Sequence, residues 1–203
     1  VNARLSETNN GESSEIYAAQ LAAVQAQNAR IYGPPSTGDP WGGASARQFR
    51  FDPRRELDQN LAIIASYVRR EDTLVDVGGG ARPGMPSVSP PVPWGINIEP
   101  SPGMAAEFGT SALEAGIENA QLIGSSLAEA DNPRGDVAFT SDVTYFVSDI
   151  VGFIHQLEVA EARRIMITIW SEPPPNRRAK LFKLIYGEEQ KILPGQQELL
   201  AVL

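Results

Sequence analysis

The chain has 203 residues, a formal net charge of −8 and no cysteine. The acidic balance argues against binding to nucleic-acid phosphates or to anionic lipid, and the lack of cysteine excludes disulfides, thiolate catalysis and zinc–sulfur sites. A single histidine excludes multi-histidine metal sites, and neither a transmembrane run nor a signal-peptide core is present, so a cytoplasmic protein without a metal is the default expectation.

Two helices are predicted before the first strand. Residues 1–14 are polar and are expected to be flexible. Apolar residues recur at helical spacing over 15–31, and a loop rich in glycine and proline follows over 32–43. A second helix is predicted from about 53 to 68, with Asp52 as its N-cap.

Strands and helices then alternate along the chain. Five apolar segments predict strands: 73–77, 94–98, 120–123, 136–140 and 164–170. The last of them is nearly all apolar, which is typical of a central parallel strand. Helices are predicted from Ser101 to Gly116, over 147–162, and from Asn176 to Gly187, with Leu181, Phe182 and Ile185 of the last one facing inward. This alternation predicts a mostly parallel sheet with right-handed connections.

The most informative segment is the glycine run after the first strand. Residues 75–80 read Val-Asp-Val-Gly-Gly-Gly, and Glu99 ends the next strand nineteen residues beyond Gly80. Glycines let the backbone approach a ligand closely, and an acid at the second strand's tip can accept hydrogen bonds from both ribose hydroxyls. Without a ligand, the same residues would be a tight turn followed by a surface acid. The pattern favours a site for an adenosine-containing cofactor.

Three ordered segments resemble the motifs of class I S-adenosylmethionine-dependent methyltransferases: 75–80, 98–104 and 135–140. The resemblance covers about 50–170. It implies an α/β, Rossmann-like doubly wound sheet of seven strands, preceded here by the two N-terminal helices, with S-adenosylmethionine lying across the carboxyl ends of the strands. The implied cofactor contacts are Asp76, Gly78, Gly79 and Gly80 on the methionine side, Glu99 at the ribose, Pro100 under the adenine, Ser126 and Leu127 at the adenine edge, and Thr140 and Ser141 beside the sulfonium.

The chain departs from this family in two places. Arg82 stands where the family often has a third glycine, and the crossover over 82–93 holds five prolines, which oppose a regular helix. Beyond the helix that follows the fifth strand, 191–193 and 199–203 offer little material for two further strands. The expected organisation is therefore a single domain over 15–203. It comprises N-terminal helices over 15–70, a cofactor-binding core over 71–170, and a C-terminal helix with a sheet edge that could be incomplete over 171–203.

Candidates for chemistry lie after the fourth strand. Asp142 could orient an acceptor or act as a base, although a turn-capping role explains it too. Tyr145 could contact substrate or could simply pack at a helix entry. His155 falls off the apolar face of its helix, which favours a solvated residue over a catalytic base. Four aromatic residues could form a lid over the acceptor or could fasten a loop to the core: Tyr17, Tyr32, Trp41 and Phe49.

Two further segments are candidates for contact with the acceptor. The end of the fifth strand, 170–172, could line the same pocket, and Arg177 and Arg178 in a first helical turn could attract an anionic acceptor or form a solvated face.

Three functions remain open from the sequence. The first is methyl transfer to a small-molecule acceptor, which the acidic composition favours over nucleic acid. The second is a non-catalytic binding or scaffold protein on a degenerate methyltransferase fold, which Arg82 and the proline-rich crossover motivate. The third is a nicotinamide-dependent oxidoreductase, which is disfavoured because Pro83 stands where the dinucleotide fingerprint needs glycine.

Overall fold

The computed structural model describes residues 10–34, 37–50, 59–81 and 94–203. The chain divides into two compact units. We call residues 36–141 with 155–167 the sheet unit, and residues 1–35, 142–154 and 168–203 the helical unit. Within the described ranges, every helix is too short or too polar to cross a bilayer.

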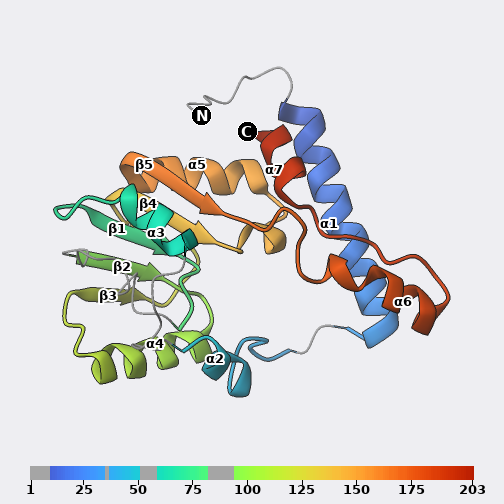
Figure 1. The fold of residues 1–203 in the computed structure, drawn as a ribbon, viewed down its shortest axis with the longest axis horizontal. Helices are drawn as coiled ribbons and strands as arrows, with labels where there is room; N and C mark the ends of the chain where they lie inside the picture. Colours follow the sequence, from blue (N-terminus) through green and yellow to red (C-terminus); the bar gives the residue numbers. More distant parts are fainter. Residues whose placement is uncertain (1–9, 35–36, 51–58, 82–93) are drawn as a thin grey trace. The chain divides into compact units, whose positions relative to one another are not determined.

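The sheet unit is built on five parallel strands in the order β3-β2-β1-β4-β5 (Figure 1). The strands are β1 (Thr73–Val77), β2 (Trp94–Ile98), β3 (Ala120–Ile123), β4 (Gly135–Ser141) and β5 (Glu161–Thr168). Val77 of β1 lies level with Ile98 of β2 and with Thr140 of β4, so the carboxyl ends of three neighbouring strands meet at one edge. The predicted α/β class with a parallel sheet is confirmed.

The core of this unit forms on the central strands. Leu74, Val137 and Phe139 are buried together, and residues of helix α3 (Gln59–Ser66) and of the segment after it pack against them with Met166 of β5. Helix α3 falls within the predicted second helix, whose start, with Asp52, lies outside the described residues. The mostly apolar central residues of β1 and β4 are what burial on both faces of a parallel sheet requires.

Helix α4 (Pro102–Ala115) begins and ends where the sequence predicts. The Ser101 hydroxyl accepts a hydrogen bond from the Met104 amide at 3.1 Å, which satisfies one free N–H of the first turn. Gly116 closes the helix in the left-handed conformation with φ of 64°. Met104 and Phe108 are buried, as expected.

The fifth strand and the helix before it differ from prediction. Helix α5 covers Ile150–Ala160, not 147–162, because the Asp149 carboxylate accepts the Gly152 amide at 2.9 Å and fixes the start there. A short 3-10 turn, η1 (Thr144–Phe146), precedes it. Strand β5 consequently begins at Glu161, and it lies at the end of the described sheet, not at its centre. Its apolar run is only half-buried, and an apolar run alone does not reveal a strand's place in a sheet.

The helical unit contains α1 (Asn10–Tyr32), α7 (Gln196–Val202) and a 3-10 turn, η2 (Asn176–Arg178), that leads directly into α6 (Ala179–Tyr186). Tyr17 and Leu21 of α1 and Leu199 and Val202 of α7 are buried. Residues 196–202 are thus helical and 191–193 form no strand, so the described part of the chain holds five strands, not the seven that the resemblance implies.

Helix α6 packs differently from the prediction. Phe182 is buried, but the side chains of Leu181 and Ile185 are 55% and 61% exposed, so their predicted inward orientation is wrong. Asn176 does not cap the helix. Its amide instead donates to the Leu193 carbonyl at 2.9 Å and accepts the Leu193 amide at 2.8 Å.

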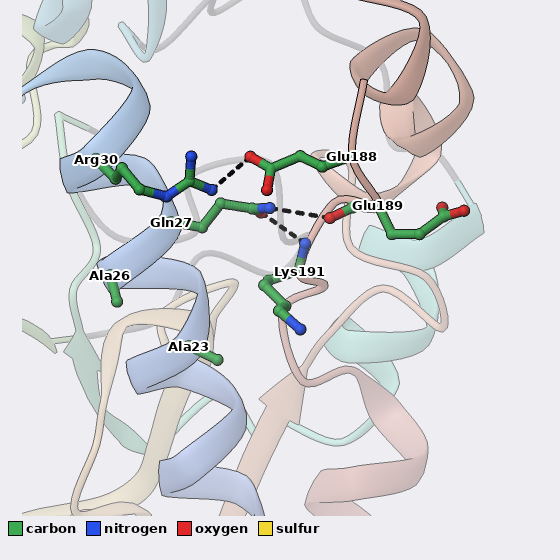
Figure 2. Close-up of a pocket in the computed structure, with 7 residues that line it drawn as sticks. All are labelled: Ala23, Ala26, Gln27, Arg30, Glu188, Glu189 and Lys191. Atoms are coloured by element: carbon green, nitrogen blue, oxygen red, sulfur yellow. Dashed lines mark hydrogen bonds and ion pairs between the residues drawn. The ribbon is translucent and has the colours of Figure 1, made fainter. Parts of the chain in front are cut away.

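A buried glutamine joins α1 to the segment before α7 (Figure 2). The Gln27 side chain donates to the Glu189 carbonyl at 2.9 Å and accepts the Lys191 amide at 2.6 Å, and Arg30 pairs with Glu188 beside it. These contacts border an open hollow of about 540 Å³. Gln27 thereby satisfies backbone groups of a segment that is itself neither helix nor strand.

Candidate functional site

The glycine run forms a tight turn at the carboxyl end of β1. Gly78 and Gly80 adopt φ of 68° and 64°, a region that glycine enters without steric cost. The Gly78 amide donates to the Ile98 carbonyl at 2.8 Å, which ties the turn to the end of β2.

At position 79, glycine is required because there is no space for a side chain. A Cβ atom there would lie 2.6 Å from Oδ2 of Asp76 and 3.0 Å from Oδ1 of Asn97. Both of these side chains are buried, at 6% and 2% exposure. The turn therefore lies directly against two polar side chains from adjacent strands.

Glu99 follows β2 and is held from two sides. Its Oε2 accepts the Gly80 amide at 2.9 Å and its Oε1 accepts the Ser101 amide at 2.8 Å. The carboxylate therefore links the glycine turn to the start of α4. An ionised carboxylate has about four acceptor positions, so two remain for further donors.

The environment of Glu99 shifts its ionisation. Burial raises the pKa of the Glu99 carboxyl, the amides of Ser101 and Gly80 oppose that rise, and the negative charge of Asp39 adds to it. The net effect is a pKa above the usual value for glutamate.

Asn97 completes this cluster and was not predicted as a site residue. Its Nδ2 donates to the Gly80 carbonyl at 3.1 Å. The signal was available in the sequence, because Asn97 is a polar residue between Ile96 and Ile98 in a strand of otherwise apolar character.

Three other residues predicted to contact the cofactor lie at or beside the carboxyl ends of β2 and β4. The Thr140 hydroxyl is buried and donates to the Val77 carbonyl at 2.9 Å, so it joins the ends of β4 and β1. Pro100 and Ser141 are exposed beside the same strand ends. Arg82 lies outside the described residues.

Ser126 and Leu127 follow β3 in a compact turn. The Ser126 amide and hydroxyl both donate to the Glu129 carboxylate, at 3.3 Å and 2.7 Å. Leu127 is buried and lines a hollow of about 330 Å³ together with residues of α5, among them His155 and Val159. No described contact joins either residue to the glycine turn.

Asp142 and Tyr145 are in direct contact within the helical unit. The Tyr145 hydroxyl donates to Oδ1 of Asp142 at 3.1 Å and accepts the Trp170 amide at 2.7 Å. Burial is the main cause that raises the pKa of Tyr145 above its ordinary value, so the phenol is neutral and acts as a donor, not as a base. Asp142 is exposed and adopts φ of 59°, which is uncommon for a residue other than glycine.

The four aromatic residues proposed as a lid occupy different settings. Tyr17 is fully buried in α1, where its hydroxyl donates to the Thr144 carbonyl at 2.9 Å, and burial raises its pKa to about 12. It is therefore a core residue, not part of a loop. Tyr32 packs edge-on against Tyr186, and Trp41 packs edge-on against Phe49.

Two other groups singled out in the sequence are exposed. His155 is solvent-accessible and pairs with Glu158 on α5, as its place off the apolar face predicts. The guanidinium of Arg177 stacks over the Trp170 ring at 4.7 Å.

Comparison with solved structures identifies the fold. A methyltransferase from Aquifex aeolicus that depends on S-adenosylmethionine matches 73% of this chain and 93% of its own, with 18% identity and a TM-score of 0.55. Magnesium protoporphyrin IX methyltransferase from Synechocystis PCC 6803, solved with S-adenosylhomocysteine, matches 93% of this chain and 85% of its own, with 13% identity and a TM-score of 0.56. The chain has the class I methyltransferase fold.

Other comparisons extend this result. Coclaurine N-methyltransferase, bound to N-methylheliamine and S-adenosylhomocysteine, shares the methyltransferase fold with a TM-score of 0.52 at 8% identity, over 98% of this chain and 65% of its own. The chain spans 60% and 54% of the length of two further matched structures. No protein-family profile and no curated protein sequence matches the chain.

The residues at the glycine turn fit an adenosine-containing cofactor. The turn has no side chain at 78–80, and a Cβ at Gly79 would collide with the polar layer beneath it. Glu99 keeps free acceptor positions after its two backbone contacts. These are the two properties that recognition of a ribose beside a glycine turn requires.

Proposed function

We propose that this chain transfers a methyl group from S-adenosylmethionine to a small-molecule acceptor. The observation that carries the proposal is Glu99, whose carboxylate lies between the glycine turn and α4 on a methyltransferase fold. Glu99 would accept hydrogen bonds from the ribose hydroxyls, and Gly78, Gly79 and Gly80 would give the methionine portion access to the backbone.

When bound, S-adenosylmethionine supplies an activated methyl group, so the chain's own contribution is alignment and exclusion of water. Asp142 is exposed directly after β4 and would orient the acceptor or take its proton. Tyr145 would hold the Asp142 carboxylate in place as a neutral donor.

Two observations support a small acceptor. The net charge of −8 disfavours long polyanionic substrates. Two enzymes of the same fold, magnesium protoporphyrin IX methyltransferase and coclaurine N-methyltransferase, are named for small molecules.

The first test is calorimetric titration of the full chain with S-adenosylhomocysteine, with NAD as a second ligand. Wild type should bind S-adenosylhomocysteine and not NAD. Glu99→Ala should weaken that binding by roughly 10- to 100-fold, because charge-assisted hydrogen bonds to the ribose are lost. Glu158→Gln is the matched control, since it removes an exposed glutamate whose ion pair in the described part of the chain is with His155.

The outcomes separate the alternatives. Binding of NAD alone would support an oxidoreductase. A folded wild-type chain that binds neither ligand would be a non-catalytic protein on this fold.

A further inference from the structure

A segment that precedes the sheet in sequence lies along α4. We call residues 37–50 the strap; it contains the short helix α2 (Ala44–Gln48) and belongs to the sheet unit. At its start, Oδ2 of Asp39 accepts the Ser101 hydroxyl at 2.7 Å and the Gly103 amide at 2.8 Å. Oδ1 of the same carboxylate accepts the Trp41 amide at 3.0 Å.

The strap and α4 approach closely along their length. A Cβ at Gly103 would lie 2.5 Å from Cα of Gly42, so the two backbones touch. Farther along, Ala46 is buried against Ala81 and Met104. At the end, Arg50 pairs with Glu107 at 2.8 Å and with Glu114 at 3.1 Å. The strap is thus fastened at its start, middle and end.

These contacts reach Ser101, which holds Glu99, and the residue next to Gly80, which holds it from the other side. Ser101 donates its amide to Oε1 of Glu99 and its hydroxyl to Asp39. Ala81, which packs against the strap, directly follows Gly80, whose amide donates to Oε2 of Glu99. The position of the Glu99 carboxylate therefore depends on groups that the strap holds in place.

We propose that Asp39 is a positioning residue of the cofactor site, which fixes Ser101 and through it directs the Glu99 carboxylate toward the ribose. This inference rests on the proposed function, since it gives Asp39 a role in binding S-adenosylmethionine. Asp39 makes no described contact with a group assigned to the cofactor, so it acts on binding through Ser101 and, at low pH, through the negative charge that it holds near Glu99.

The experiment measures S-adenosylhomocysteine affinity and thermal stability for wild type, Asp39→Asn and Asp39→Ala. Asp39→Ala should weaken binding about tenfold, the equivalent of one charge-assisted hydrogen bond. Asp39→Asn keeps the side-chain shape and one acceptor oxygen, so it should fold like wild type and lose less affinity. Asp149→Asn is the matched control, because Asp149 also accepts an amide at a helix start but lies outside the Glu99 cluster.

Two further readouts distinguish positioning from simple fastening of the loop. In a double-mutant cycle at neutral pH, Asp39→Ala should change S-adenosylhomocysteine affinity little in a Ser101→Ala background. Both substitutions act on the same contacts, which run from Asp39 through Ser101 to Glu99. Both Asp39 variants remove a negative charge near Glu99, which should lower the pKa of the Glu99 carboxyl. The pH below which binding is lost should therefore be lower in these variants than in wild type. The other carboxylate beside the glycine turn, Asp76, is present in all variants.

Each result has a defined meaning. If wild type binds S-adenosylhomocysteine and Asp39→Ala binds equally well, the inference is overturned and the proposed function stands. Equal losses in Asp39→Ala and in the Asp149→Asn control would overturn it as well, because the loss would then follow from general destabilisation. If wild type does not bind, the proposed function fails and the inference fails with it.

Discussion

Replacing Gly79 by alanine tests whether the glycine turn is pressed against its polar layer. The new methyl group would lie 2.6 Å from Oδ2 and 2.7 Å from Cγ of Asp76, and 3.0 Å from Oδ1 of Asn97. Ordinary contacts between such atoms begin at roughly 3.4 Å, so the buried Asp76 side chain or the turn must move by several tenths of an ångström. Overpacking of this kind costs about 1–3 kcal/mol in unfolding free energy.

Gly109→Ala is the matched control. Gly109 lies in α4, and a Cβ there meets nothing within 4 Å, so alanine should stabilise the chain by about 0.5–1 kcal/mol through helix propensity. Since 1 kcal/mol shifts Tm by about 2–4 °C in a chain of this length, thermal unfolding should give Gly79→Ala a Tm lower by about 2–12 °C and Gly109→Ala a Tm at or above that of wild type. Gly79→Ala should also weaken S-adenosylhomocysteine binding, whereas Gly109→Ala should not. A Gly79→Ala chain as stable as wild type would refute the tight packing of the turn.

Two further predictions concern ionisable groups. Glu99 accepts ribose hydroxyls best when ionised and its pKa is raised, so S-adenosylhomocysteine affinity should be full at neutral pH and fall as the pH drops through that raised pKa. Calorimetry across pH should show this fall in wild type and not in Glu99→Gln; a flat wild-type profile would contradict it. Tyr145→Phe should lower stability by about 0.5–1.5 kcal/mol, because the part-buried hydrogen bond from the Trp170 amide is lost, yet leave S-adenosylhomocysteine affinity unchanged. Weaker binding without a loss of stability would assign Tyr145 to the cofactor site instead.

The fold could be predicted where the sequence carries local signals. Ser101, Pro102 and Gly116 marked both ends of α4, because capping depends on residues within one turn of the helix end. The buried strands β1 and β4 were readable as apolar runs bounded by polar or glycine-rich segments. Such signals need no knowledge of distant contacts.

Features that depend on distant contacts could not be predicted in the same way. The place of β5 at the end of the described sheet depends on which strands pair, and its apolar run is the same at an edge or at the centre. The exposed face of α6 likewise depends on what packs against it. The contact of Asp39 with Ser101 joins residues 62 positions apart, and nothing in the loop sequence indicates that distance.

The two sides of the candidate site differ in the same way, since one depends on local sequence and the other on distant contacts. Its cofactor side is encoded in short runs, because Asp76 and the glycines are consecutive and Glu99 ends the neighbouring strand. On the proposed acceptor side, Tyr145 depends on the Trp170 amide, twenty-five positions away. The sequence therefore predicts Asp76, the glycines and Glu99 together at the turn, but Asn97 was not among the predicted residues, and the sequence left the role of Tyr145 open between substrate contact and packing.

The distribution of buried polar residues favours a ligand-binding site over a purely structural turn. Asp76, Asn97, Glu99 and Thr140 are all buried at or beside the carboxyl ends of three adjacent strands. Burial of polar groups is costly unless each is hydrogen-bonded, and a sheet that needed only stability would place apolar side chains there. Open parallel sheets bind their ligands at this edge. The turn accounts for part of this cluster, since Asn97 and Glu99 both bond Gly80, whereas a cofactor site would also explain the acceptor positions of Glu99 that its two backbone contacts leave.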